Sequence, residues 1–442
     1  MRGPPPASGK PAPGKRPAAR SAERLRDALS LLADGKLDAA QSCCDAVLAI
    51  EARELDALHI SGLIALRRGD PSRAVKLFNA AIRVNPGEAM VYNNRGLALQ
   101  DLHEFDAAMA SFDRAITFRP DYADAYFHQS LVLLLTGDFD RGWKLHEWRR
   151  KLSVAAQTEH TVIEPGWLCH DLTGKTLLLY SEQGLGDTIM FSRYAKLAAQ
   201  RGAKVILAAP APLVPLLATL ADGIESIEII EAGAEVTAID YLCALHSAPL
   251  AFATRLETIP FAGPYLHADP ARISTWETRL GARTRPRIGI AWSGNPSFKS
   301  DHTRSMHLAQ LLAHLPASCE YVALQNDIRA HDRAAFDATP SLRFFGDDLR
   351  DFSDTAALCS LMDVVVSVDT SIAHLAGALG KPCWIMLPYL PDWRWLLGRA
   401  DSPWYESVRL FRQDGDRSWE PVLARISAEL AALARPESSE GR

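Results

Sequence analysis

The chain has 442 residues, of which 48% are apolar and 23% charged, and its formal net charge is −5 at pH 7. This length and composition are typical of globular proteins with two or three domains, and the slight acidic excess argues against an extended nucleic-acid-binding surface. The sequence contains no run of about 18 apolar residues, so we expect no transmembrane segment and a cytoplasmic location.

The two ends of the chain differ in composition from the rest. Residues 1–20 are rich in proline, glycine and lysine and hold no apolar run, which predicts a disordered tail and not a signal peptide. Residues 436–442 are expected to form a second disordered tail. The seven cysteines include no Cys-x-x-Cys pair, so they are expected to be reduced core thiols.

Residues 21–157 contain an internal repeat. Five pairs of identical residues are 34 positions apart, namely Gly62 and Gly96, Ala74 and Ala108, Phe78 and Phe112, Ala81 and Ala115, and Pro86 and Pro120. This is the period of tetratricopeptide helical hairpins. Weaker matches one period earlier and one later predict about four hairpins, with the outer ones as caps. Such a stack usually binds a protein or peptide on its concave face, and an inert spacer is the alternative.

The repeated 34-residue spacing also predicts how particular residues pack within each hairpin. Gly62 is expected to let the first helix lie close to the second, and Phe78 to fill the seam between hairpins. Pro86 should end the second helix, because proline cannot donate a backbone hydrogen bond. After the last hairpin, Trp143 and Trp148 are expected to pack the end of the stack against the next domain, and residues 158–174 to form a linker.

From Lys175 onward, short apolar runs alternate with helical patterns, which predicts parallel strands with crossover helices. Two such sets, residues 175–280 and 281–435, predict two Rossmann-like lobes that face a cleft. Gly184 and Gly186 follow the first strand at a helix start, where free N–H groups can bind an anion. The third glycine of a dinucleotide fingerprint is missing, so a nicotinamide site has little support.

The stretch DVVVSVDTSIAHLAGALGKPCWIMLP is the most informative part of the second set. A buried strand over 364–368 is followed by Asp369, Thr370 and Ser371 at a helix start. Thr370 or Ser371 caps this helix, and the exposed N–H groups at the carboxyl end of the strand suit a phosphate.

Four segments in this order resemble the glycosyltransferase domain of bacterial tetratricopeptide glycosyltransferases. They read EQGLGDTIMFSRY, AWSGNPSFKSDHTRSMHL, SVDTSIAHLAGALGKPCWIMLPYLPDWRW and SPWYESVRLFRQ. That domain is similar to the heptosyltransferases of glycosyltransferase family 9 and more distantly to the protein O-GlcNAc transferases. The resemblance implies an all-α tetratricopeptide solenoid followed by an α/β GT-B fold.

The resemblance also implies functional residues. Asp187 corresponds to the aspartate that is held to act as the base in heptosyltransferases. Lys299 corresponds to a lysine that contacts the donor phosphate, and Arg304 is nearby. The D-T-x-x-x-H pattern that binds the nucleotide diphosphate corresponds here to Asp369, Thr370 and His374. The expected substrate-binding residues are Gly184, Gly186, Asn295, Lys299, Arg304, Ser305, Gln325, Asp369, Thr370, Ser371 and His374.

The residue types suit glycosyl transfer without a metal or other cofactor, because cations and a helix dipole can hold the departing diphosphate. The segments Met306-His307 and Tyr389-Leu390 depart from the heptosyltransferase sequences, which leaves the sugar and the acceptor open. Each role also has a structural alternative: Asp187 as a helix cap, Lys299 and Arg304 as solvated charges, and His374 as a core residue.

Three functions are compatible with these features. The first is a glycosyltransferase that moves a sugar from a nucleotide diphosphate donor to a protein or glycan acceptor, with the repeats presenting the acceptor or a partner. The second is a non-catalytic tetratricopeptide adaptor whose GT-B domain binds a nucleotide sugar. The third is a two-lobed nucleotide-sugar epimerase, since fold alone does not fix function.

Overall fold

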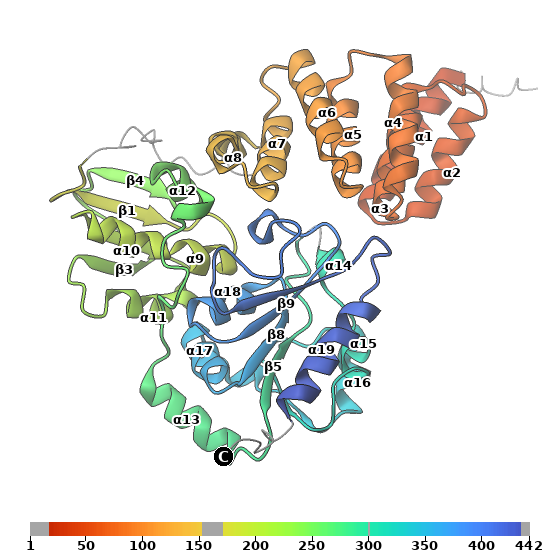
Figure 1. Ribbon diagram of the computed structural model, residues 1–442. Coiled ribbons are helices and arrows are strands. Elements are labelled where there is room, and N and C mark those ends of the chain that lie inside the picture. Colours follow the sequence, from red (N-terminus) through yellow and green to blue (C-terminus); the bar gives the residue numbers. More distant parts are fainter. Residues whose placement is uncertain (1–16, 153–170, 299–300, 435–442) are drawn as a thin grey trace, which may run out of the picture. The chain divides into compact units, whose positions relative to one another are not determined.

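The computed structural model describes residues 17–152, 171–298 and 301–434 (Figure 1). Residues 17–20, expected in the N-terminal tail, instead form the first turn of a helix. Proline is favoured at the first helical position, and the alanines and arginine that follow are good helix formers. The rest of that tail, the tail at 436–442, most of the linker at 158–174 and Lys299 lie outside the described residues.

The chain divides into two compact units, which are described separately. The first comprises residues 1–132 and 148–155, and the second comprises residues 133–147 and 156–442. The division falls inside the helix α7 (Ala123–Leu135), so the following helix α8 (Phe139–His146) belongs to the second unit.

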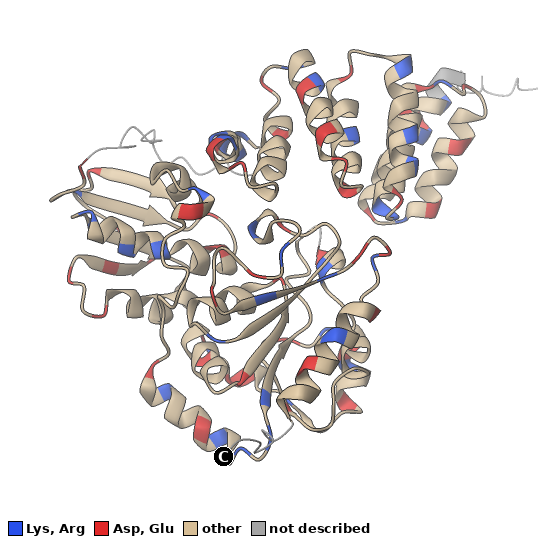
Figure 2. Ribbon diagram, in the orientation of Figure 1, with Lys and Arg blue, Asp and Glu red and all other residues tan. Residues whose placement is uncertain are grey.

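The first unit is built from helical hairpins, as the 34-residue period predicts. Its helices are α1 (Pro17–Ala33), α2 (Leu37–Leu48), α3 (Leu55–Arg67), α4 (Pro71–Val84), α5 (Ala89–Asp101), α6 (Phe105–Phe118) and the first part of α7. Consecutive helices pair, α1 with α2, α3 with α4 and α5 with α6. Charged residues of both signs are spread over these helices (Figure 2), with only acidic ones in α2 and only basic ones in α4.

Close contacts between glycine and phenylalanine define the seam of each hairpin. The Phe78 and Phe112 rings are fully buried. A Cβ added to Gly62 would lie 2.4 Å from the Phe78 ring, and one added to Gly96 would lie 2.4 Å from the Phe112 ring. The glycines are therefore required for close approach of the helices, as the sequence predicts.

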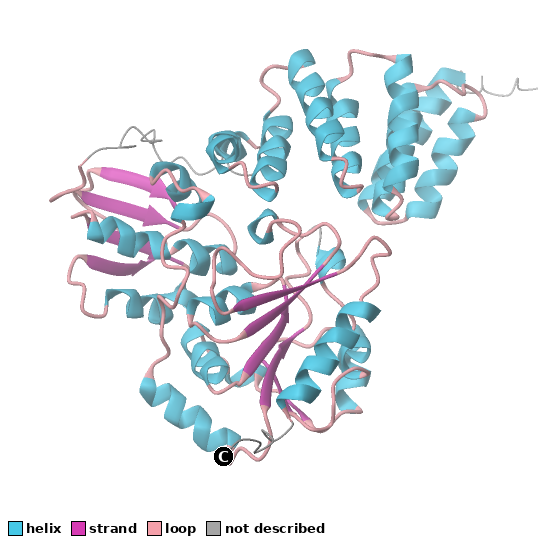
Figure 3. Cartoon of the chain, in the orientation of Figure 1, coloured by secondary structure: helices cyan, strands magenta, loops and turns pink. Residues whose placement is uncertain are grey.

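The second unit contains two parallel sheets flanked by helices (Figure 3). The first sheet has the order β3-β2-β1-β4, with β1 (Thr176–Tyr180), β2 (Lys204–Ala209), β3 (Ile227–Glu231) and β4 (Tyr241–Ala244). The second has the order β10-β9-β8-β5-β6-β7, with β5 (Arg287–Ala291), β6 (Glu320–Ala323), β7 (Leu342–Arg343), β8 (Val364–Val368), β9 (Cys383–Leu387) and β10 (Val408–Arg412). The predicted fold class, helical repeats followed by two Rossmann-like lobes, is confirmed.

Helices lie between the strands of the second unit, and a last helix, α19, follows the final strand. They are α9 (Leu185–Phe191), α10 (Arg193–Gln200), α11 (Val214–Leu217), α12 (Ala248–Ala251), α13 (Pro270–Leu280), α14 (Asp301–Arg304), α15 (Leu308–Leu312), α16 (Arg333–Asp337), α17 (Phe352–Ser360), α18 (Ser371–Ala378) and α19 (Glu420–Leu433). Every residue of β5, β8 and β9 is buried, as expected for central strands of a parallel sheet that is covered on both faces.

The two tryptophans beyond the repeats pack in different units. Trp143 on α8 is buried, donates a hydrogen bond from Nε1 to the Thr254 carbonyl at 3.1 Å and meets the Trp393 ring edge-on. Trp148 instead stacks on Tyr126 in the first unit, with ring centroids 3.9 Å apart. The α8 helix is thus part of the core of the second unit.

Among the helices of the described segments, none combines the length and apolarity needed to cross a lipid bilayer.

The hairpin seam yields a prediction in the form of a double-mutant cycle. Phe78→Ala should destabilise the first unit by ~3–5 kcal/mol, because a fully buried ring is lost. Gly62→Ala alone should cost ~1–3 kcal/mol, since its Cβ clashes with the Phe78 ring. In the Phe78→Ala background the same change should be neutral or stabilising by up to ~1 kcal/mol, because alanine favours the helix and now has room. Denaturant unfolding of the four variants measures this coupling.

The neighbouring hairpin supplies the control. Gly96→Ala clashes with Phe112 and not with Phe78, so it should remain destabilising in the Phe78→Ala background. Equal costs for Gly62→Ala in both backgrounds would show that the ring and the glycine do not share the seam.

Candidate functional site

Polar side chains from several loops of the second unit meet at the carboxyl ends of the two sheets. Parallel sheets place their ligand-binding loops at this edge. The loops follow β1, β4, β5, β8 and β9, and the side chains that they bring together are Asp187, His246, Arg304, Asp369, His374, Asp392 and Arg394.

Asp187 makes two charge-assisted contacts in the first turn of α9. Its Oδ2 accepts a hydrogen bond from the Gly184 backbone N–H at 3.2 Å, which caps the helix start. Its Oδ1 accepts one from Nη2 of Arg394 at 2.5 Å. The side chain remains 23% exposed. Asp187 therefore caps its helix, which is the structural role that the sequence analysis gave as the alternative to a base. It also belongs to the polar cluster.

Arg394 is the cationic centre of this cluster, and the sequence analysis did not single it out. Its guanidinium is buried, pairs with Asp392 at 2.8 Å as well as with Asp187, and lies over the Trp393 ring. Burial works against ionisation of Asp187, but Arg394 and then His246 outweigh it and hold the pKa of Asp187 well below its usual range. Asp187 is therefore ionised at any physiological pH.

Gly186 allows the starts of α9 and α18 to approach each other. A Cβ at Gly186 would lie 2.9 Å from Cδ2 of His374 and 3.2 Å from Cα of Ser371. The His374 side chain and the Ser371 backbone therefore leave no space for a larger residue at this position. Because Gly186 has no side chain, the start of α9 after β1 can lie directly against the start of α18 after β8.

The start of α18 combines a helix cap with a buried carboxyl group. Thr370 is the N-cap, and its Oγ1 accepts a hydrogen bond from the Ile372 N–H at 3.3 Å. Arg304 donates from Nη1 to the Asp369 carbonyl at 2.7 Å. Burial and the nearby Asp392 raise the pKa of Asp369 to about 6. This carboxyl group can therefore change its charge near neutral pH.

His374 is a neutral imidazole in the core of the site. Burial and the charge of Arg394 lower the pKa of His374 to about 3. Its Nδ1 lies 2.9 Å from the Tyr405 hydroxyl, and its ring stacks on Trp395. Its Nε2 lies 3.9 Å from Oδ1 of Asp369. His374 is therefore a core residue, as in the structural alternative of the sequence analysis, and its ring also borders the cluster.

The loop after β5 is organised by the buried Asp301, another residue that the sequence analysis missed. Asp301 accepts hydrogen bonds from Arg304 Nε at 3.2 Å, Arg329 Nη2 at 2.5 Å and Ser305 Oγ at 2.8 Å. Ser305 Oγ in turn accepts one from the Gly294 N–H. Asp301 thus holds Arg304 in the orientation that lets it reach Asp369.

Asn295 and Gln325 order loops in this structure. Asn295 is exposed, and its side-chain oxygen accepts a hydrogen bond from the Ser297 N–H at 2.9 Å. Gln325 accepts from the Trp292 N–H at 3.1 Å and donates to the Asp327 carbonyl at 2.7 Å. Substrate contact by these two residues remains a prediction, and Lys299 lies outside the described residues.

His246 directly follows β4 and points at the acidic side of the cluster. It is buried, with Nε2 3.8 Å from Oδ1 of Asp187 and Nδ1 3.6 Å from Oε1 of Glu182. Neither ring nitrogen has a hydrogen-bond partner among the described residues. His246 therefore presents two unsatisfied polar atoms to the carboxylates at this edge of the cluster.

Three chemical functions are thus combined in one place. An ionised carboxylate (Asp187) can accept a proton, guanidinium groups (Arg304, Arg394) can stabilise negative charge, and a capped helix start (Thr370) offers N–H groups to an anion.

Comparison with known proteins first identifies the repeats. The tetratricopeptide repeat family matches at residues 25–89, 61–123 and 93–142. The chain therefore carries tetratricopeptide repeats, as the 34-residue period predicts. A homologue of the protein STIP1 from Dictyostelium discoideum is 28% identical over 103 residues, which are 23% of this chain and 18% of that protein.

One curated relative is similar over most of the chain. Protein FlbA of Caulobacter vibrioides is 27% identical over a 402-residue alignment that covers 84% of this chain. The matched region spans 66% of FlbA, just under two thirds of its length.

Among solved structures, a mutant of the Thermobaculum terrenum O-GlcNAc transferase aligns with 95% of this chain and 92% of its own, at 16% identity and a TM-score of 0.35. The MamA protein aligns with 31% of this chain and 75% of its own, at 22% identity and a TM-score of 0.28. The chain is thus similar to FlbA across both of its parts, and its N-terminal part consists of tetratricopeptide repeats.

Proposed function

We propose that the chain is a metal-independent glycosyltransferase that moves a sugar from a nucleotide diphosphate donor to a protein or glycan acceptor. The observation that carries the proposal is the close approach of two helix starts at Gly186. It puts the ionised carboxylate of Asp187 next to the start of α18 and to the Arg394 guanidinium, while Arg304 contacts the Asp369 carbonyl just before the α18 cap. Three of the four sequence segments that resemble glycosyltransferases contribute the residues of this arrangement.

In the proposed reaction, the acceptor hydroxyl oxygen forms a bond to the anomeric carbon while the bond from that carbon to the diphosphate oxygen breaks. The hydroxyl proton passes to Asp187, and the negative charge that develops on the diphosphate is stabilised by Arg304 and the N–H groups at Thr370. The pair with Arg394 makes Asp187 a weak base. Proton transfer is therefore expected late, when the forming bond has already made the hydroxyl acidic.

The donor is proposed to bind mainly to the second lobe, where the capped start of α18 and Arg304 can neutralise two phosphate groups. The tetratricopeptide repeats are proposed to present the acceptor or a protein partner. A cytoplasmic location remains a prediction.

The competing proposal is a non-catalytic adaptor. It is favoured by the fact that Asp187 already has two structural partners, the Gly184 N–H and Arg394, so its ionised state needs no substrate. An epimerase is separated from both by its product, since it would return an altered nucleotide sugar without an acceptor.

Calorimetric titration of the full chain with a panel of nucleoside diphosphates and nucleotide sugars would identify the donor. The same panel then provides an assay for transfer or for slow hydrolysis of the donor by water.

The first functional prediction is that Asp187→Asn lowers the rate of transfer or donor hydrolysis by ~10²–10⁴-fold, the usual contribution of a general base. Asparagine is still a competent cap, so the local fold should persist. Donor affinity should be retained, because the donor is held by the second lobe. Turnover, donor binding and melting temperature would be measured on the same variant.

Loss of the Arg394 pair will also lower stability, so a control must separate the two effects. Glu320→Gln breaks a comparable pair, because Glu320 lies 3.4 Å from the buried Arg287 in the second lobe. This control should lower the melting temperature and leave turnover of the folded protein unchanged. Equal turnover in the Asp187→Asn variant and the parent would refute the base role. A parent that binds the donor but shows neither transfer nor donor hydrolysis would support the adaptor.

The raised pKa of Asp369 gives a pH-dependence prediction. Above about pH 6 this carboxyl group becomes negative and repels the diphosphate, so affinity for a nucleotide sugar should fall as the pH rises from 5 to 8, by at most about tenfold per pH unit. The diphosphate of a nucleotide sugar is esterified at both ends and does not titrate in this range. Asp369→Asn should flatten the profile. A parent affinity that is constant from pH 5 to 8 would contradict the prediction.

A further inference from the structure

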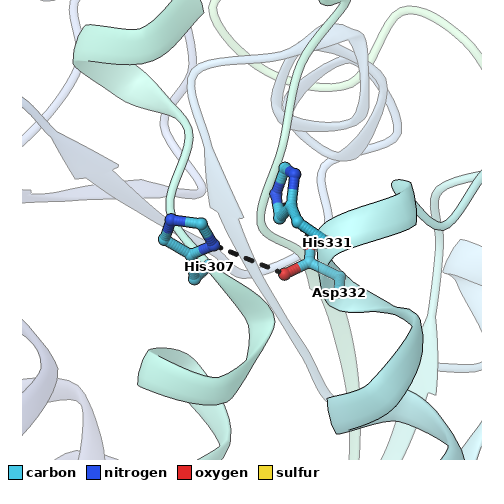
Figure 4. Close-up of side chains that lie close together, drawn as sticks. All are labelled: His307, His331 and Asp332. Carbon is cyan, nitrogen blue, oxygen red and sulfur yellow. Dashed lines mark ion pairs between the residues drawn. The ribbon is translucent and has the colours of Figure 1, made fainter.

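His307, His331 and Asp332 converge in the second lobe and have no role in the proposed transfer (Figure 4). His307 is the N-cap residue of α15, and His331 and Asp332 end the short 3-10 helix η6 (Ala330–Asp332) just before α16. Nδ1 of His307 lies 3.9 Å from Oδ1 of Asp332, and Nε2 of His331 lies 3.5 Å from its Oδ2. The three donor atoms lie within 4.8 Å of one another.

The carboxylate of this group is buried and already oriented. Asp332 accepts a hydrogen bond from the Leu308 N–H through Oδ1 and one from Nε1 of Trp292 through Oδ2, both at 2.8 Å. Each carboxylate oxygen has two lone-pair positions, so each keeps one free. Hydrogen bonds of this kind fix the orientation of a carboxylate that binds a metal.

The charge of Asp332 has no permanent cationic partner in the described segments. The basic groups within 4.0 Å of it there are the two imidazoles, which carry charge only when protonated. A buried carboxylate is costly unless it is paired or binds a cation. A divalent ion between Asp332 and neutral imidazoles would supply the missing positive charge.

We propose that His307, His331 and Asp332 bind a divalent transition metal ion, with Zn²⁺ as the best match. Two imidazoles and a carboxylate are ligands that zinc accepts, and a water molecule would complete the tetrahedron. In such a site the donor atoms lie about 3.4 Å apart, given metal–ligand distances of about 2.1 Å. The histidine side chains are 71% and 47% exposed, so rotation of the rings can close the difference from the observed spacing.

A metal here would act on the loop between β5 and α15. Trp292, which donates to Asp332, begins this loop, and its carbonyl accepts a hydrogen bond from the Met306 N–H at 3.0 Å. His307 immediately follows Met306. The ion would therefore fasten both ends of the segment that carries Asp301 and Arg304, and we assign it a structural role outside the candidate active site.

Titration of the metal-free full chain with Zn²⁺ alone tests the proposal. We expect one saturable equivalent and a rise in melting temperature, because the ion binds the folded state. His307→Gln and His331→Gln should each weaken binding by at least about tenfold, since even loss of an outer-shell partner costs about 10–100-fold. Co²⁺ in place of Zn²⁺ should give visible absorption bands that both variants lose.

The matched control is His267→Gln. His267 is exposed and lies 2.6 Å from Oδ2 of Asp222, so it forms a histidine–carboxylate pair that lacks a third ligand. This variant should keep the affinity and the Co²⁺ spectrum of the parent. The proposal is overturned if the parent shows no saturable equivalent, or if the two site variants bind as the parent does. Without metal, all variants should melt like the parent, because the substituted side chains are exposed.

Discussion

The buried guanidinium of Arg193 links the lobe of the first sheet to segments that lead into and belong to the lobe of the second sheet. Arg193 begins α10 in the first lobe, is fully buried and donates to the carbonyl oxygens of Pro260 and Trp404 and to the Tyr265 hydroxyl. Arginine does not lose its charge in proteins, so the fold has to supply these acceptors. The crossover segment near Pro260 and the segment before β10 are thereby tied to the first lobe.

This arginine also supports the candidate site through packed side chains. Its guanidinium lies 4.8 Å from the centre of the Tyr405 ring, and the Tyr405 hydroxyl pairs with His374. His374 in turn leaves no room for a side chain at Gly186. The approach of the two helix starts is therefore set by contacts in the core, and Arg394 adds a second buried cation that joins Asp187 to the loop after β9. The polar groups are held in place by the fold itself, as electrostatic catalysis of the proposed transfer would require.

The features recovered from the sequence are those that local patterns encode. The 34-residue period identified the hairpins and their glycine–phenylalanine seam, and runs of apolar residues identified most strands. The sequence analysis named no strand at β4 or β10, and β10 has no continuous apolar run because it carries Arg409 and Arg412. Proline, glycine and helix-cap patterns likewise placed Asp187 and Thr370 at helix starts.

The partners of the candidate site residues were not recoverable in this way. Asp187 and Arg394 are 207 positions apart, and Arg304 and Asp369 are 65 apart, so no local pattern links them. His246 follows a strand that the sequence did not reveal, and Asp301 looks like an ordinary loop residue until Arg304, Ser305 and Arg329 surround it. These residues matter because of contacts that form only when the chain is folded, and such contacts cannot be read from a single sequence.

The position of α8 in the second unit limits how such a protein can be rearranged during evolution. The Phe139 and Trp143 rings lie against Trp404 and Trp393, so they are part of the core around the sheets although the repeat period includes them. Gene rearrangements that insert or delete whole hairpins before α7 leave this aromatic contact intact. Recombination immediately after α8 would separate the rings from their partners and expose apolar surface on both products. The repeat array is therefore free to vary in length from its N-terminal side only.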